Sequence, residues 1–92
     1  MPYVVSNIAV KVLKREEDEG TLDFAIKADV ANHGENEEVM VEIQGLDRDG
    51  FEVYALYLRG RVPRGSSKTL SIKEDYVSFA DFNGIVKWQY SH

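Results

Sequence analysis

The chain lacks cysteine altogether, and it has only two prolines, two histidines and no long apolar run. The absence of cysteine excludes disulfides, zinc–thiolate sites and thiol nucleophiles, and it says nothing about the redox compartment. No basic segment precedes a long apolar stretch, so the sequence predicts neither a signal peptide nor a transmembrane helix. We therefore expect no membrane insertion and a cytoplasmic protein, or an extracytoplasmic one if the chain was excised from a longer exported protein.

Positive charge is also scarce. Eleven lysines and arginines stand against sixteen aspartates and glutamates, which gives a formal net charge of -5. Proteins that bind a phosphate backbone present clustered lysine and arginine, so this balance argues against a nucleic-acid partner. Ninety-two residues, 43% of them hydrophobic, are enough for one small core, and we expect a single domain spanning residues 1–92.

Apolar residues recur at every second position over most of the chain, which is the period of a β-strand with one buried face. Two such runs lie near the N-terminus: Val4, Ser6, Ile8, Val10 and Val12 in the first, and Leu22, Phe24, Ile26, Ala28 and Val30 in the second. Residues 15–20 form a polar loop between them. We therefore expect the two strands to pair with Val12 opposite Leu22.

A hairpin is predicted around Asp47-Arg48-Asp49-Gly50. We expect a three-residue loop, residues 48–50, with Gly50 in the left-handed region as a bulge. This register pairs Gly45 with Val53, Ile43 with Ala55, and Val41 with Tyr57. It separates polar from apolar side chains better than the four-residue loop that pairs Leu46 with Phe51. The inner face then carries Val39, Val41, Ile43, Phe51, Val53, Ala55 and Tyr57, and the outer face carries Met40, Glu42, Gln44, Leu46, Glu52, Tyr54, Leu56 and Leu58.

The last third of the chain contains two turn signals. Val62-Pro63-Arg64-Gly65-Ser66 predicts a turn before a strand with Leu70 and Ile72 inward. Asn83-Gly84 predicts a hairpin that pairs Phe79 with Trp88 and Val77 with Tyr90, and a helical turn at residues 78–81 is the alternative. With these strands the count is seven, which is typical of an all-β antiparallel sandwich of two sheets.

About half of the chain carries a recognisable order of motifs. Asn32-His33-Gly34 is followed by a V-x-V-x-I run at residues 39–43, by D-x-D-G at residues 47–50, and by V-P-x-G-S-S-x-T-L at residues 62–70. This order resembles the bacterial immunoglobulin-like modules of the FxLYD and CARDB kind. The resemblance implies an immunoglobulin or fibronectin-III-like sandwich, a non-catalytic role, often at the cell surface or beside other domains, and no catalytic residues to carry over.

The sequence contains few patterns that are typical of catalysis or metal binding. We therefore expect that the protein is not an enzyme and that it has no catalytic residues, no metal site and no cofactor. His33 lies in a predicted turn and His92 is the last residue, so neither is placed to act as an oriented general base. The acidic run at residues 16–19 and the pair Asp47 and Asp49 could supply oxygen ligands to calcium, but Leu58 occupies the place where a calcium loop would close with glutamate. Solubilising charge and turn formation explain both clusters more simply.

The predicted outer face of the central hairpin carries more apolar residues than a solvated sheet face requires. Its candidate interaction surface consists of Met40, Leu46, Tyr54, Leu56 and Leu58. A patch of this kind marks a contact surface for a second copy, giving a homodimer, or for another protein, unless the chain's own loops cover it.

The favoured function is therefore a protein-interaction or assembly module, working through this face or by strand addition at an open sheet edge. The alternatives are a carbohydrate- or calcium-binding module that uses loop carboxylates and rim aromatics such as Tyr54, Tyr76 or Trp88, and an enzyme whose site is assembled from distant residues.

Overall fold

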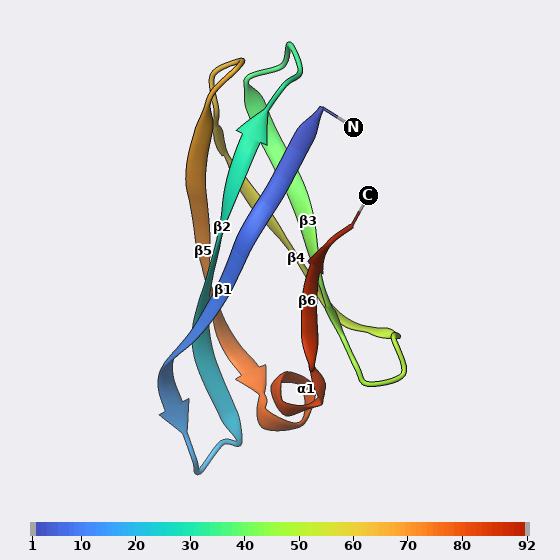
Figure 1. Ribbon diagram of the computed structural model, residues 1–92. Coiled ribbons are helices and arrows are strands. Elements are labelled where there is room, and N and C mark those ends of the chain that lie inside the picture. The colour runs from blue at the N-terminus through green and yellow to red at the C-terminus, as the bar shows by residue number, and fades with distance from the viewer. Residues whose placement is uncertain (1, 92) are drawn as a thin grey trace.

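The computed structural model describes residues 2–91, which form six strands and one short helix. In chain order the elements are β1 (Tyr3–Glu16), β2 (Thr21–Asn32), β3 (Glu38–Leu46), β4 (Glu52–Arg61), β5 (Ser67–Ser78), α1 (Phe79–Gly84) and β6 (Lys87–Tyr90). The strands make two three-stranded antiparallel sheets, in the orders β1-β2-β5 and β4-β3-β6 (Figure 1). The all-β prediction is confirmed, whereas the predicted count of seven strands is six within residues 2–91.

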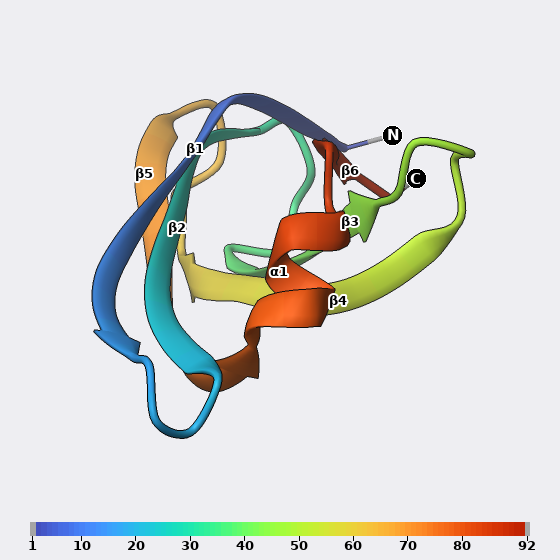
Figure 2. The same ribbon diagram turned by 90° about the horizontal axis from the view of Figure 1, so that it is seen from below.

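The two sheets face one another across a single apolar core, and α1 lies at one end between them (Figure 2). The alternating residues of β2 supply its centre, because β2 is the middle strand of its sheet and is flanked on both sides. The fully buried apolar side chains are Leu22, Phe24, Ile26, Ala28, Val30, Val41, Ile43, Leu58 and Val62. The predicted inner face of the second strand is thus confirmed residue by residue.

The predicted register between the first two strands is wrong by two residues, and its face assignment fails at the start of β1. Val12 pairs with Phe24 rather than Leu22. A bulge lies between Ser6 and Ala9, where Asn7 has a positive φ of 54°. Because one extra residue reverses the side-chain alternation, Val4 is exposed and Tyr3 and Val5 turn towards the core instead.

The hairpin between β3 and β4 is one residue out of the predicted register. Gly45 pairs with Tyr54, Ile43 with Leu56, and Val41 with Leu58. Gly50 has a φ of 86°, as predicted, but the irregularity in the ladder lies between Gly45 and Leu46, opposite β4 residues 52–54. Val53 is a second extra residue, and it reverses the faces of the β4 residues that follow it. Of the seven residues predicted to face inward, Val39, Val41 and Ile43 are buried. The other four are exposed, namely Phe51, Val53, Ala55 and Tyr57.

The C-terminal segment follows the helical alternative. The predicted hairpin at Asn83-Gly84 is wrong, because residues 79–84 form α1 and β6 pairs with β3. Ser78 caps the helix, with its side-chain oxygen accepting from the Asp81 N–H at 3.1 Å. Trp88 consequently lies opposite Gly45, not Phe79. The turn at residues 62–66 is confirmed: Gly65 has a φ of 78°, and the Ser66 N–H donates to the Pro63 carbonyl at 3.0 Å.

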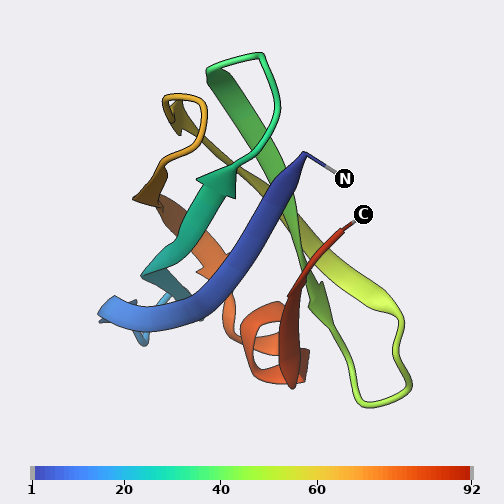
Figure 3. The same ribbon diagram turned by 45° about the horizontal axis from the view of Figure 1, so that its top comes forward.

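Each sheet has three strands, and the two sheets are open along both long sides of the molecule, where their edge strands lie. β1 and β6 border one side and β4 and β5 border the other (Figure 3). On the second side, the Tyr54 hydroxyl of β4 donates to Glu74 Oε1 of β5 at 2.8 Å and joins the two sheets. Ile72, predicted inward, lies on the inner face of β5 but is 37% exposed at this side.

Candidate functional site

The structure does not bring the predicted interaction surface together. Leu56 and Leu58 belong to the core, with exposed fractions of 3% and 0%. The register shift in the β3–β4 hairpin is the reason, because it turns both leucines from the outer to the inner face. Met40 is exposed on the outer face and Leu46 is half-buried. The five residues therefore form no common surface.

Tyr54, the fifth residue of that prediction, lies between the sheets. Its ring packs against Phe24 and Trp88 with centroid separations of 5.9 and 6.3 Å. Burial, reinforced by the hydrogen bond to Glu74, raises the pKa of the Tyr54 hydroxyl well above its ordinary value. This tyrosine is a structural bridge between β4 and β5.

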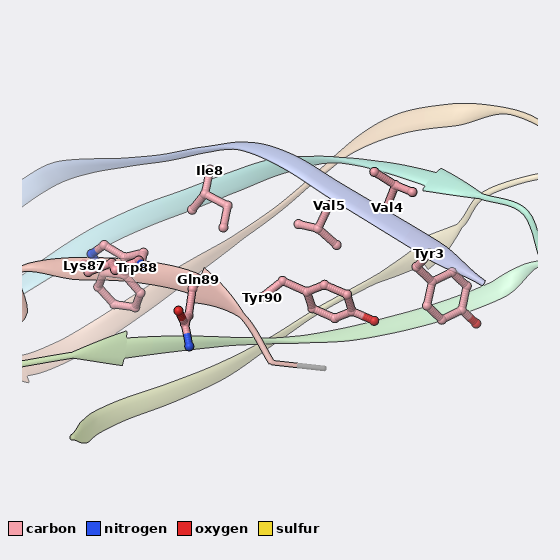
Figure 4. Close-up of a pocket in the computed structure, with 8 residues that line it drawn as sticks. All are labelled: Tyr3, Val4, Val5, Ile8, Lys87, Trp88, Gln89 and Tyr90. Atoms are coloured by element: carbon pink, nitrogen blue, oxygen red, sulfur yellow. The ribbon is translucent and has the colours of Figure 1, made fainter. Parts of the chain in front are cut away.

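A groove of about 480 Å³ lies between β1 and β6. Figure 4 shows Val5 and Ile8 of β1 directed towards β6, on the side where Trp88 and Tyr90 lie. The residues that line this β1–β6 groove are Tyr3, Val4, Val5, Ile8, Lys87, Trp88, Gln89 and Tyr90. The apolar ones, Val4 apart, pack against the core while staying partly exposed. The groove is thus an uncovered margin of the core.

The backbone of β6 faces this groove. The Ser91 N–H donates to the Glu42 carbonyl at 2.9 Å, and the pairing continues with Gln89 opposite Gln44. In an antiparallel ladder the hydrogen-bonded residues alternate with residues whose main-chain groups point away from the partner strand. Trp88 is one of the latter, so its N–H and C=O point to the free edge of β6 while its side chain lies against Phe24.

The edge of β6 is the shortest of the four sheet edges, and its four-residue ladder with β3 contains no register shift. β1 has register shifts at Ser6/Ala9 and Val12/Lys14, and the ladder of β5 shifts opposite Leu22/Phe24. β4 carries the extra residue described above. Bulges of this kind twist an edge away from further pairing. The ladder between β6 and β3 shows no such shift, so β6 keeps the geometry that another strand requires.

The charge of the groove differs from that of the whole molecule. Among its eight lining residues Lys87 is the charged one, and within residues 2–91 it forms no ion pair. Towards the opposite end, burial and the neighbouring Tyr3 raise the pKa of the Tyr90 hydroxyl. A chain of net charge -5 therefore has a groove without carboxylates.

The acidic clusters do not assemble into a metal site: no group of three or more histidine, aspartate or glutamate side chains within residues 2–91 is arranged to hold an ion. Asp47 Oδ1 instead accepts from the N–H groups of Asp49 and Phe51, both at 2.9 Å, and shapes the hairpin loop. Glu17 pairs with Arg15. The His33 side chain is exposed, as predicted, and His92 lies outside the described residues.

Sequence reasoning missed most of this groove. The alternation Lys87-Trp88-Gln89-Tyr90 shows that Trp88 and Tyr90 share a face, but the contribution of β1 depends on the bulge at Asn7. The Asn7 amide donates to Asp29 Oδ2 at 2.8 Å, and this contact with a residue 22 positions away carries no local sequence signal.

Comparison of the chain with protein-family models, with curated proteins and with solved structures finds no match. Within residues 2–91, none of the helical structure has the length and apolar character that crossing a membrane requires.

Proposed function

We propose that the chain is a non-catalytic protein-interaction module that takes up an extended strand of a partner protein in the β1–β6 groove. The observation that carries the proposal is the combination of a regular free edge at β6 with an uncovered apolar margin beside it. Strand addition uses both features, since main-chain hydrogen bonds give affinity and alternate side chains fill the apolar margin.

The strand order supports an immunoglobulin-like interpretation, which we include in the proposal. Constant-type immunoglobulin domains arrange strands A, B, E and D in one sheet and strands C, F and G in the other, and variable-type domains add strands C′ and C″ to the second sheet. The orders β1-β2-β5 and β4-β3-β6 correspond to A-B-E and C′-C-F. In this scheme strand G lies beside F, which corresponds to the edge of β6 along the β1–β6 groove. A strand added there would occupy the position of G.

Two variants test the location. Ile8→Lys places a charge in the β1–β6 groove, and Met40→Lys places the same charge on the exposed outer face of β3. After circular dichroism has shown that both fold, each is used with the unaltered chain to capture partners from extracts of the native cell. A protein bound by the unaltered chain and by Met40→Lys, but lost with Ile8→Lys, is the expected result. A protein lost only with Met40→Lys, or no specific capture, contradicts the proposal.

Carbohydrate binding is the second candidate, because the groove exposes parts of Tyr3, Trp88 and Tyr90, and aromatic rings can stack on sugars. Trp88 is the single tryptophan of the chain and lines this groove, so its fluorescence is sensitive to a ligand bound there. A saturable change in Trp88 emission on adding common mono- and disaccharides would favour this alternative. We expect no such change.

A further inference from the structure

The chemistry of the β1–β6 groove also specifies the incoming strand. We infer that it runs antiparallel to β6, alternates apolar with polar residues, and carries a carboxylate opposite Lys87. This inference rests on the proposed strand addition and adds to it a direction and a charge preference, each of which follows from a separate feature of β6.

The direction follows from the sheet. β4, β3 and β6 are antiparallel neighbours throughout, and antiparallel pairs are slightly more stable per residue than parallel ones. An antiparallel strand places its C-terminal end beside Lys87, where β6 begins, and its N-terminal end towards Tyr90.

The alternation follows from the faces of β6. Trp88 and Tyr90 point inward to the core margin, while Lys87 and Gln89 lie on the other face. Side chains directly opposite in a ladder share a face. The residue opposite Trp88 therefore points into the groove over Val5 and Ile8 and is apolar, and the residues opposite Lys87 and Gln89 are polar.

The charge follows from Lys87. It is the charged residue of the groove lining and has no ion pair within residues 2–91. An opposite charge directly across a ladder stabilises the pair, and a like charge destabilises it. A partner strand with glutamate or aspartate at this position is complementary, whereas one with lysine or arginine is not.

A second copy of the chain fits this position poorly. Two β6 edges paired antiparallel would offer Lys87 no carboxylate, because the residues of β6 are Lys87, Trp88, Gln89 and Tyr90. The free edges of β1, β4 and β5 belong to strands whose ladders contain register shifts. We therefore assign the groove to a strand of a different protein.

The test uses the whole chain, labelled with ¹⁵N, and three capped seven-residue peptides. The first alternates valine and threonine and has glutamate as its next-to-last residue. The second has lysine in place of that glutamate. The third keeps the glutamate but has proline in place of the valine that would face Trp88, so it cannot donate the main-chain hydrogen bond to the Trp88 carbonyl. Binding is followed by Trp88 fluorescence and by amide hydrogen exchange of the Trp88 N–H, at low salt to limit screening.

We expect the glutamate peptide to protect the Trp88 N–H and to bind about three- to tenfold more tightly than the lysine peptide, which is the range of an exposed cross-strand charge pair. The proline peptide should bind weakly. In the variant Lys87→Glu the order of the first two peptides should reverse, and this exposed substitution should leave the fold intact.

The outcomes separate this inference from the proposed function. Equal binding of the glutamate and lysine peptides, with Trp88 protected, overturns the charge preference and leaves strand addition standing. No binding and no protection with any peptide contradicts both. Protection of the Trp88 N–H that grows with protein concentration in the absence of peptide would mean that a second copy fills the groove, which overturns the assignment to a different protein.

Discussion

At the scale of single residues, Asn32 shows how the loops at one end of the sheets are held. Its side chain is completely buried, and its Nδ2 donates to the carbonyls of Asn36 and Val62 at 2.9 and 2.8 Å. Its Oδ1 accepts from the Gly34 N–H at 2.8 Å. One amide thus satisfies three main-chain groups that have left the sheet ladders, and it ties the segment after β2 to the end of β4.

Removing the Asn32 amide should destabilise the folded chain. We expect Asn32→Ala to lower the free energy of unfolding by about 3 kcal/mol, because it leaves two carbonyls and one N–H without their partner. The matched control is Asn36→Ala, whose exposed side chain accepts one hydrogen bond from the Glu38 N–H and should cost less than about 1 kcal/mol. Urea denaturation monitored by Trp88 fluorescence measures both. Equal losses in the two variants would contradict this role of Asn32.

Tyr54 predicts a dependence of stability on pH. Burial and Glu74 raise the pKa of its hydroxyl in the folded state, while an unfolded tyrosine ionises near pH 10. The contribution of Tyr54 is complete below that pH and is lost above it, because the unfolded chain then releases a proton that the folded chain retains. In Tyr54→Phe this loss is absent.

The difference in the free energy of unfolding between the unaltered chain and Tyr54→Phe should therefore become smaller as the pH rises from about 8 to about 11. Urea midpoints measured across this range give this difference directly. Tyr57 and Tyr90 also have raised pKa values, but both chains contain them, so their contributions cancel in the comparison. A difference that stays constant with pH would contradict the bridging role of Tyr54.

At the scale of elements, the β3–β4 hairpin depends on where one extra residue is placed. The ladder pairs Val41 with Leu58 and Ile43 with Leu56, which puts both leucines in the core. We expect Leu58→Ala to cost about 3 kcal/mol through the cavity it leaves. Met40→Ala, on the opposite face of the same sheet, should change the free energy of unfolding by less than about 0.5 kcal/mol. Similar small losses in the free energy of unfolding for both variants would contradict the observed register and favour the one predicted from the sequence.

The elements differ in how far the sequence predicts them. The core face of β2 follows directly from its uninterrupted alternation, and Gly50 and Gly65 follow from turn chemistry. The faces of β1 and β4 do not, because each strand has a bulge and one added residue reverses the pattern that follows. The Asn83-Gly84 pair is a strong hairpin signal, but here it falls at the end of α1, where the cap of Ser78 and the packing of Phe82 on Phe24 decide the conformation.

The candidate site was harder to predict than the fold for the same reason. A surface defined by β4 side chains reverses with the register, and Leu56 and Leu58 moved from the predicted contact face into the core. The β1–β6 groove depends on contacts between the two ends of the chain, Tyr3 to Ile8 with Lys87 to Tyr90. Periodicity within one strand contains no information about which edge lies beside it.

At the scale of the whole molecule, the two three-stranded sheets leave two open sides, and these sides differ in their contacts. The β4–β5 side is bridged by the hydrogen bond from Tyr54 to Glu74. The β1–β6 side contains the larger groove and borders the edge of β6, and none of the eight residues that line this groove carries a carboxylate. This asymmetry supports the strand addition that we propose at the β1–β6 side.

The most direct test of this account is amide hydrogen exchange in the isolated chain, comparing the neighbouring residues Trp88 and Gln89. The Gln89 N–H points to β3 and should exchange slowly, while the Trp88 N–H points to the free edge and should exchange much faster. Rapid exchange at Trp88 beside slow exchange at Gln89 is the predicted result. Equal protection of the two amides at high dilution would show that the edge of β6 is already covered by the chain itself, and it would contradict the account.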